Sequence, residues 1–406
     1  MSSVIIDPES VRALPAAEPS HYRGDIQGLR AIAVILVVLD HAGVPGFQGG
    51  YVGVDVFFVI SGYVITSLLV RQPPRHLAAN LGTFYARRIR RIVPAATVVL
   101  VATVLVAYVT LGANFNPQLL GDVRWASLFA ANFRLIATGS NYFIPGVAPS
   151  LITHFWSLAV EEQFYLVYPL VVFLSTRSNL ERRRRTSLAL ILVLGVAVSA
   201  WWSWHLTPLA PVEAYYSPFT RFWELGLGGL ATLVPAYWTR RAPRLNAVLA
   251  VLALVALGDG VLRLNATSAY PGTLAWIPCG AAALLLVTGV VPARAGPATW
   301  LAWRPLRYVG DISYSLYLYH YAWLMLPLLW TTPTTSAAAR ALEVAGALIC
   351  SILSYHLIEN PIRRSSRLSR DRLAALLVLL VCVAASWNAT LLVARLAHLA
   401  PYALSH

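Results

Sequence analysis

The chain has 406 residues, of which 58% are hydrophobic and 12% are charged. Soluble domains carry about 25% charged residues, so this sequence has too few charges to cover a soluble protein of its length. Several apolar runs approach the roughly 20 residues that a membrane-spanning helix needs. The composition therefore indicates a polytopic membrane protein. It excludes a cytosolic enzyme, a disordered chain and a secreted disulfide scaffold.

The net charge of +14 comes from 31 basic residues, all arginine, against 17 acidic residues. In a membrane protein this excess is typical of cytoplasmic loops and does not indicate nucleic-acid binding. Cys279, Cys350 and Cys382 lie in apolar runs without CxxC spacing, so we expect neither a disulfide framework nor a metal site. The first 20 residues lack the apolar stretch of a cleavable signal peptide.

Eleven apolar segments are predicted to be transmembrane helices. If the N-terminus is cytoplasmic, most of the arginines fall in the connecting segments on the cytoplasmic side, as in other membrane proteins. The predicted fold class is an all-α polytopic membrane protein with about 11 transmembrane helices and a cytoplasmic N-terminus. The predicted spans are residues 28–45, 52–70, 92–112, 154–175, 187–205, 219–238, 246–262, 272–292, 309–329, 337–358 and 373–396.

The segment 113–153 is the long outer connection, and it contains aromatic residues such as Trp125, Tyr142 and Phe143. It could be a re-entrant or interfacial segment that caps the outer mouth of the protein. It could equally be an amphipathic helix that rests on the membrane surface. The sequence leaves both alternatives open.

The first predicted span carries Arg30 and, eleven residues later, His41. Eleven residues are about three helical turns, so the two side chains share a face and lie about 16 Å apart along the axis. A buried imidazole is a common general base for a hydroxyl. His41 could instead be an interfacial histidine at the outer end of the span.

A carboxylate beside an imidazole would fix its tautomer. Asp40 precedes His41 directly but points about 100° away on the helix. Asp55 opens the second span across a short turn and is the preferred partner, although both aspartates stay candidates. In the same span, Ser61 and Gly62 indicate close helix packing.

The segment FYARRIRR holds Arg87, Arg88, Arg90 and Arg91 at the cytoplasmic start of a helix. Arginines three residues apart lie on one helical face. Such a cluster either anchors the helix to anionic lipid, which is the simpler interpretation, or binds phosphate groups in a bidentate manner.

The fourth span begins HFWSLAVEEQFY, in which His154, Ser157, Glu161 and Tyr165 share one face. Glu161 and Glu162 are adjacent carboxylates about two turns into the span, where they need partners or a water-filled cavity. Later predicted spans also contain polar or ionisable residues, namely Glu224, Asp311, Tyr317 and His320. A tyrosine-rich helix with one histidine could line a sugar or hydroxyl site, or lie in an interfacial belt.

Six strings together resemble the acyltransferase family 3 membrane proteins, which O-acetylate glycans such as O-antigen and peptidoglycan. They occur in family order over about 340 residues. The strings are DIQGLRAIAVILVVLDHAGVPGFQGGYVGVDVFFVISGYVIT (25–66), FYARRIRRIVPA (84–95), HFWSLAVEEQFYLVYPL (154–170), SPFTRFWELGLGGL (217–230), RPLRYVGDISYSLYLYH (304–320) and HLIENPIRR (356–364).

The resemblance implies transfer of an acyl group, usually acetyl from acetyl-CoA, to a sugar hydroxyl without a metal. The family's Arg-x10-His pair falls on Arg30 and His41, and its RxxR motif falls on Arg88 and Arg91 or on Arg87 and Arg90. Its acidic motif falls on Glu161 and Glu162. His41 is then expected to act as general base or as a transient acyl carrier, and Arg30 to stabilise CoA or the oxyanion. The predicted catalytic residues are Arg30, His41, Asp55, Glu161 and Glu162. Arg87, Arg88, Arg90 and Arg91 are expected to bind CoA. The residues expected to bind substrate are His154, Ser157, Tyr165, Glu224, Asp311, Tyr317 and His320.

The resemblance is greatest to the branch whose members carry an SGNH-type esterase domain after an eleventh span. It predicts a cytoplasmic tail at 1–25, a ten-helix acyltransferase core at 26–362, a basic loop with one extra helix at 363–396, and an extracytoplasmic tail at 397–406. No SGNH block follows, so we expect a member that works alone, a shortened chain, or a separate SGNH-type partner. The expected location is the bacterial cytoplasmic membrane, with lipid and a glycan or lipid-linked sugar as the other partners.

Two alternatives stay open. Some relatives acylate small molecules such as macrolide antibiotics, whose hydroxyl is reached from the cytoplasm. A transporter would also bury ionisable residues along its path, although the sequence lacks the inverted repeat and paired broken helices that many transporters show.

Overall fold

The structure is a computed structural model that describes residues 23–71, 74–143, 150–175, 180–290, 296–329, 336–365 and 372–398. All regular elements within these residues are helical, as predicted. Most of the predicted N-terminal tail and the residues after 398 lie outside the described ranges. The elements are α1 Gly24–His41, η2 Gly50–Val52, α2 Gly53–Val70, α3 Pro74–Leu111, η3 Gly112–Asn114, α4 Gln118–Ser127, α5 Ala131–Ala137, α6 Phe155–Ser175, α7 Glu181–Leu206, α8 Pro211–Tyr216, α9 Pro218–Ala231, α10 Ala236–Arg241, α11 Pro243–Arg263, α12 Trp276–Thr288, α13 Pro297–Leu301, α14 Arg304–Asp311, α15 Ser313–Met325, η4 Pro327–Leu329, α16 Ala337–Ser354, η5 Tyr355–Glu359, α17 Asn360–Arg364 and α19 Arg372–Leu396.

Seven of the described helices are long and apolar enough to cross a membrane, which makes this a polytopic membrane protein. The other four predicted spans coincide with α1, α9, α12 and α15, which are helical but shorter or more polar. The predicted span 309–329 is divided into two helices, because α14 ends at Asp311 and α15 begins at Ser313. The count of eleven crossings and the cytoplasmic N-terminus stay predictions. The spanning helices cover Gly50–Val70, Leu81–Leu111, Phe155–Ser175, Arg182–Leu206, Pro243–Arg263, Ala337–Arg364 and Arg372–Leu396.

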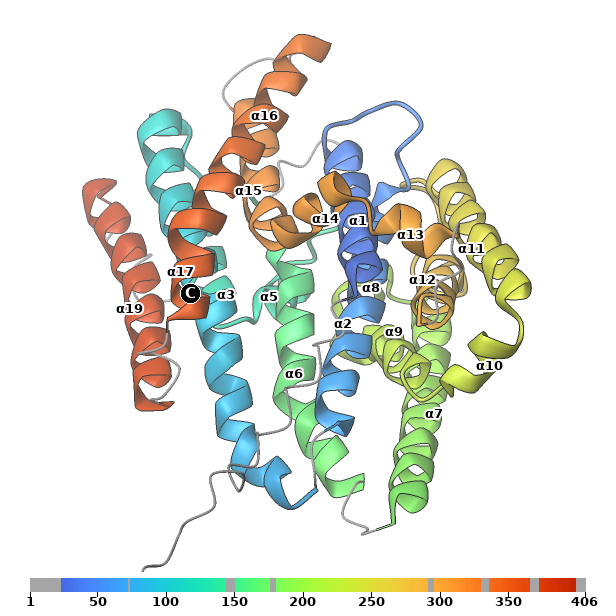
Figure 1. Cartoon of the computed structure of the whole chain (residues 1–406). Helices are drawn as coiled ribbons and strands as arrows, with labels where there is room; N and C mark the ends of the chain where they lie inside the picture. The colour runs from blue at the N-terminus through green and yellow to red at the C-terminus, as the bar shows by residue number, and fades with distance from the viewer. Residues whose placement is uncertain are drawn as a thin grey trace, which may run out of the picture.

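Helices α1 and α9 lie inside the bundle, where their ionisable groups can form hydrogen bonds and ion pairs with neighbouring helices. Helix α1 packs on α2, α13, α14 and α15, and α9 packs on α2, α7 and α12. Figure 1 shows α19 beside α3 at one edge of the bundle, with α7 and α11 towards the opposite edge. The ionisable residues Asp55, Arg221 and Glu224 are therefore buried in the interior, between longer helices that expose many apolar side chains.

Local sequence sets several helix boundaries. Helix α9 begins at Pro218, and the side chain of Ser217 caps it by accepting a hydrogen bond from the backbone N–H of Phe219 at 3.3 Å. Proline suits this position because its missing N–H would have no intrahelical partner. Near the other end of the chain, α16 passes through the π-helical turn η5 into α17, a rare geometry often found near functional sites.

The long outer segment forms two short helices that pack onto the protein. Helix α4 lies against α3 and α19, and α5 lies against α6 and α8. Leu120 and Val123 of α4 are buried, and so is Asn132 of α5. Residues 144–149 lie outside the described ranges. Just before them, Tyr142 reaches the interior, as described below.

Helices α2 and α9 approach each other closely through glycine. A Cβ atom added to Gly62 would clash with the backbone carbonyl of Leu225, and one added to Gly228 would clash with the carbonyl of Val59. The packing role predicted for Gly62 is therefore confirmed. This contact holds in register the two helices that carry Asp55 and Glu224.

The Gly62→Ala substitution is expected to destabilise the protein, because the extra methyl group must push α9 away from α2. Overpacking of this kind costs about 1–3 kcal/mol. The matched control is Gly195→Ala, a helical position of α7 with open space around the added Cβ. Thermal melting in detergent should show a lower midpoint for Gly62→Ala alone. Equal midpoints for the two variants would contradict the close approach.

Candidate active site

A cavity of about 220 Å³ lies among α1, α2, α3, α6, α14, α15 and α17. Four guanidinium groups and two carboxylates line it, so its wall has an excess of positive charge. We call it the arginine cavity. Its charged lining residues are Arg30, Arg88, Arg91, Arg363, Glu161 and Asp311, and its polar lining residues include Gln27, Ser61, Ser157, Tyr165, Tyr314 and Tyr317.

The structure separates the two alternatives for the RxxR motif. Arg88 and Arg91 lie one turn apart on α3 and both line the arginine cavity. Arg87 is exposed, and Arg90 is buried elsewhere, with its Nε donating to the carbonyl of Ala86 at 3.1 Å. The Arg88 and Arg91 pair is thus the one placed to bind an anion in the cavity.

The structure also distinguishes the adjacent glutamates. Glu161 lines the cavity and accepts hydrogen bonds from Ser61, at 2.6 Å, and from the hydroxyl of Tyr165. The guanidinium of Arg88 lies 3.6 Å from the ring centre of Tyr165, and its Nη2 is 3.9 Å from Glu161. Glu162 is not among the lining residues. Arg88 therefore lies at the cavity wall against the ring of Tyr165, with the Glu161 carboxylate close by.

Three histidines meet near the end of α1, and we call them the histidine cluster. They are His41 at the end of α1, His154 in the turn before α6, and His320 of α15. His41 Nδ1 lies 2.9 Å from His320 Nε2, and His41 Nε2 lies 2.5 Å from the hydroxyl of Tyr142. His154 and His320 are almost fully buried. The sequence singled out all three histidines, but only the fold brings them together.

Tyr317 lies between the arginine cavity and the histidine cluster. It lines the cavity, its hydroxyl is 2.6 Å from Ser157 Oγ, and it donates to the backbone carbonyl of His154 at 3.0 Å. Its ring is 5.4 Å from that of His320. Tyr317 therefore contacts both the arginine cavity and the histidine cluster.

The predicted partnership of Asp55 with His41 is wrong. Asp55 Oδ1 accepts a hydrogen bond from Arg221 at 2.9 Å, and its Oδ2 accepts one from Tyr270 at 2.6 Å. Arg221 also donates to Glu224 at 2.6 Å, and all three charged residues are fully buried. The sequence argument assumed that the short turn before α2 would aim Asp55 at α1. In the fold the carboxylate bonds to α9, because an arginine there supplies the charge that it needs.

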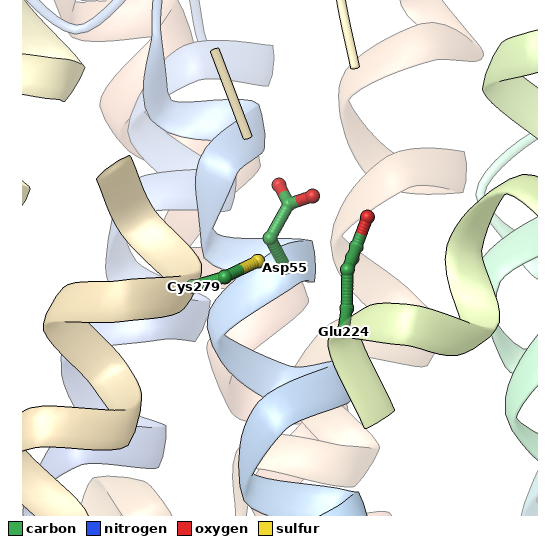
Figure 2. Close-up of side chains that lie close together, drawn as sticks. All are labelled: Asp55, Glu224 and Cys279. Carbon is green, nitrogen blue, oxygen red and sulfur yellow. The ribbon is translucent and has the colours of Figure 1, made fainter. Parts of the chain in front are cut away.

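Asp55, Glu224 and Cys279 each offer a metal-ligand atom within 4.8 Å of the others, the one such group among the described residues. Figure 2 shows how their side chains gather between three helices. The guanidinium of Arg221, however, already bonds to both carboxylates. A metal ion there would have to displace this cation, so we interpret the group as a structural ion-pair cluster, the Arg221 cluster.

Sequence reasoning missed two residues of this region. Tyr142 was noted only as one of several aromatic residues in the outer segment, and Arg363 only as part of a basic cytoplasmic loop. The fold places the Tyr142 hydroxyl against His41 and Arg363 at the cavity wall. The motif HLIENPIRR was the available signal for Arg363, since it places Glu359 one helical turn before this arginine.

Comparison with known proteins supports an enzymatic interpretation. A family model described as an acyltransferase domain matches residues 23–387. The peptidoglycan O-acetyltransferase OatA of Listeria monocytogenes is 32% identical over 366 residues, which are 85% of this chain and 56% of OatA. The putative peptidoglycan O-acetyltransferase YrhL of Bacillus subtilis is 34% identical, over 84% of this chain and 55% of YrhL. The O-acetyltransferase OatA of Staphylococcus aureus is 28% identical, over 88% of this chain and 60% of that protein.

This chain therefore spans little more than half the length of the curated relatives that it matches. No solved structure matches it significantly.

The Arg221→Met variant is expected to lose about 3–5 kcal/mol of stability, because two buried carboxylates are left without a counter-charge. The control is Arg263→Met, since Arg263 forms an exposed pair with Asp259 that contributes little. Thermal melting in detergent measures both variants, and addition of EDTA to the wild type should leave its melting temperature unchanged. A large drop with EDTA would instead indicate that a metal ion occupies this cluster.

Proposed function

Because the acyltransferase model covers most of the sequence, the chain belongs to that family, and we propose that it is a membrane O-acetyltransferase of the bacterial cell envelope. It transfers an acetyl group from cytoplasmic acetyl-CoA to a hydroxyl group of a cell-envelope glycan. The names of the relatives favour peptidoglycan as the glycan. The observation that carries the proposal is the pairing of an anion-binding cavity with a neighbouring histidine cluster.

The arginine cavity suits the phosphate groups of the donor. Guanidinium groups bind phosphate oxygens in a bidentate manner and keep their charge when partly buried. Arg88 and Arg91 present this chemistry from one face of α3, and Arg30 and Arg363 add to it from α1 and α17. The ring of Tyr165 packs against the Arg88 guanidinium at 3.6 Å, so little side-chain entropy is lost when an anion binds.

His41 supplies the base for the transfer. Its Nε2 takes the proton from the attacking hydroxyl while a C–O bond forms to the thioester carbonyl carbon. The C–S bond then breaks, and the CoA thiolate leaves and takes the proton back from His41. In the alternative route, His41 Nε2 itself carries the acetyl group between donor and acceptor. Tyr142 holds the position that a reacting hydroxyl would need, at 2.5 Å from Nε2.

The spacing of the two compartments fits the shape of the donor. Arg30 and His41 lie about three turns, or 16 Å, apart along α1. The pantetheine arm of CoA is extended and of comparable length, so its phosphates can bind the arginines while its thioester approaches His41. Tyr317 must then move aside to admit the arm, and its hydrogen bonds to Ser157 and to the carbonyl of His154 are the contacts that break.

The orientation is proposed from the arginines. Arg23 donates to the carbonyl of Leu286 at the end of α12, and Gly24 lies against Arg307 of α14. The N-terminal segment thus meets the connection between α12 and α14 at one end of the bundle, and the positive-inside rule assigns both segments to the cytoplasm. The cavity arginines then face the side on which CoA is found, in the cytoplasmic membrane. The domain boundaries and the separate SGNH-type partner stay predictions.

The His41→Ala variant is expected to lower kcat by about 10²- to 10⁴-fold, since it removes the general base. Purified protein in liposomes with acetyl-labelled CoA on the cytoplasmic face, and glycan supplied, measures CoA release and the fate of the label. Binding of acetyl-CoA should be retained, because His41 is not among the residues that line the cavity. Wild-type activity in this variant would exclude His41 as the base.

The Arg88→Gln variant is expected to raise KM for acetyl-CoA by about 10- to 100-fold, the effect of losing one charge-assisted hydrogen bond of about 1.5–3 kcal/mol. Arg87→Gln makes the same change of charge on the same helix, but at an exposed residue outside the cavity. It should leave KM unchanged. Equal effects of the two substitutions would instead indicate a general attraction of CoA to the basic surface.

A further inference from the structure

We propose that His320 is a positioning residue that holds His41 in a single tautomer, with the proton on Nδ1 and the lone pair on Nε2. The proposal rests on the proposed function, in which His41 Nε2 is the reacting atom. It deepens that function by naming what makes Nε2 basic, a task for which the sequence had suggested an aspartate. The argument follows the hydrogen bonds from the backbone of α15 to the hydroxyl of Tyr142.

The first step concerns the tautomer of His320. Its Nδ1 lies 2.7 Å from the backbone carbonyl of Tyr317 and 3.2 Å from that of Leu316. Carbonyl oxygens can only accept hydrogen bonds, so Nδ1 must carry a proton. In the neutral ring the other nitrogen, Nε2, then has only a lone pair to offer. The backbone of α15 thereby turns the buried His320 side chain into a fixed acceptor.

The second step shows that the tautomer of His320 determines the tautomer of His41. Its Nδ1 lies 2.9 Å from His320 Nε2, and since His320 accepts, His41 Nδ1 must donate. The His41 Nε2 atom is left with its lone pair, which accepts the hydrogen bond of the Tyr142 hydroxyl. Every hydrogen bond in this series has one donor and one acceptor. His41 is therefore oriented as a base before any substrate binds.

Other groups around His41 do not compete for this role. Tyr321 meets the ring of His41 edge-on, with the ring centres 4.9 Å apart, and makes no hydrogen bond to it. His154 donates from Nε2 to the carbonyl of Leu318 and lies beside His320 rather than against a nitrogen of His41. Among the described residues, no carboxylate is hydrogen-bonded to His41. A neutral histidine thus replaces the carboxylate of a typical catalytic triad.

A neutral acceptor has a physical advantage at this depth. A buried carboxylate would need its own counter-charge, whereas neutral His320 needs only the two backbone carbonyls that it already has. When His41 takes a proton on Nε2, the lone pair of His320 still accepts from Nδ1 and stabilises the imidazolium ion. The proton returns from Nε2 to the leaving thiolate, so His320 ends the cycle unchanged.

The test compares His320→Leu with His320→Gln. Glutamine places an amide oxygen near the former Nε2 and can still accept from His41, whereas leucine cannot. We expect His320→Leu to lower kcat by about 100-fold or more without a change in KM for acetyl-CoA, and His320→Gln to stay within about tenfold of the wild type. The control is His205→Leu on α7, which stacks on Trp201 away from the site and should have no effect. Equal losses for leucine and glutamine would overturn the proposal.

A second measurement reads the tautomer directly. With ¹⁵N-labelled histidine rings, the signals of His41 are those that the His41→Ala variant lacks. They should show a protonated Nδ1 and a bare Nε2 in the wild type and in His320→Gln, but not in His320→Leu. A protonated Nε2 in the wild type would overturn the proposal. Full activity of His41→Ala would instead refute the proposed function, whatever tautomer the spectra show.

Discussion

Arg221 is a fully buried guanidinium in an apolar bundle, and much of the interior is arranged around it. A charge at this depth is tolerated only with counter-charges, which Asp55 of α2 and Glu224 of α9 supply. The glycine contacts between α2 and α9 bring the two carboxylates within reach. Aromatic rings complete the shell, because Trp156 and Tyr215 lie 5.4 and 5.2 Å from the guanidinium.

The same shell reaches the proposed reaction centre. Tyr215 stacks on Tyr142, with the ring centres 4.9 Å apart, and Tyr142 in turn contacts His41. Trp156 contacts Tyr215 and is adjacent in sequence to Ser157 at the cavity wall. The ring contacts around the Arg221 cluster thus extend through Tyr215 and Tyr142 to His41. Asp55, although near His41 in sequence, therefore pairs with Arg221, and His41 takes His320 as its hydrogen-bond partner.

The interior has three compartments of distinct electrostatic character. The arginine cavity has excess positive charge, the histidine cluster is held by hydrogen bonds among uncharged groups, and the Arg221 cluster pairs one cation with two carboxylates. A polyanionic donor and a hydroxyl acceptor need different surroundings, namely cations for phosphate and a dry base for proton transfer. Tyr317 separates these two environments and touches both.

The sequence by itself determined the all-helical membrane class and the approximate positions of the long helices, and it named most of the polar residues that line the arginine cavity. These features follow from local composition and helical periodicity, which do not depend on distant contacts.

Only the tertiary structure decided which neighbour each residue uses. Glu161 and Arg88 line the cavity, whereas the adjacent Glu162 and Arg87 do not. Adjacent residues on a helix point about 100° apart, and the packing of the helices decides which one faces the cavity. The tertiary structure also paired Asp55 with Arg221 and His41 with His320, partners 166 and 279 residues away along the chain. Such pairings arise because a buried polar group takes whichever partner the fold brings near, and sequence distance carries no information about that choice.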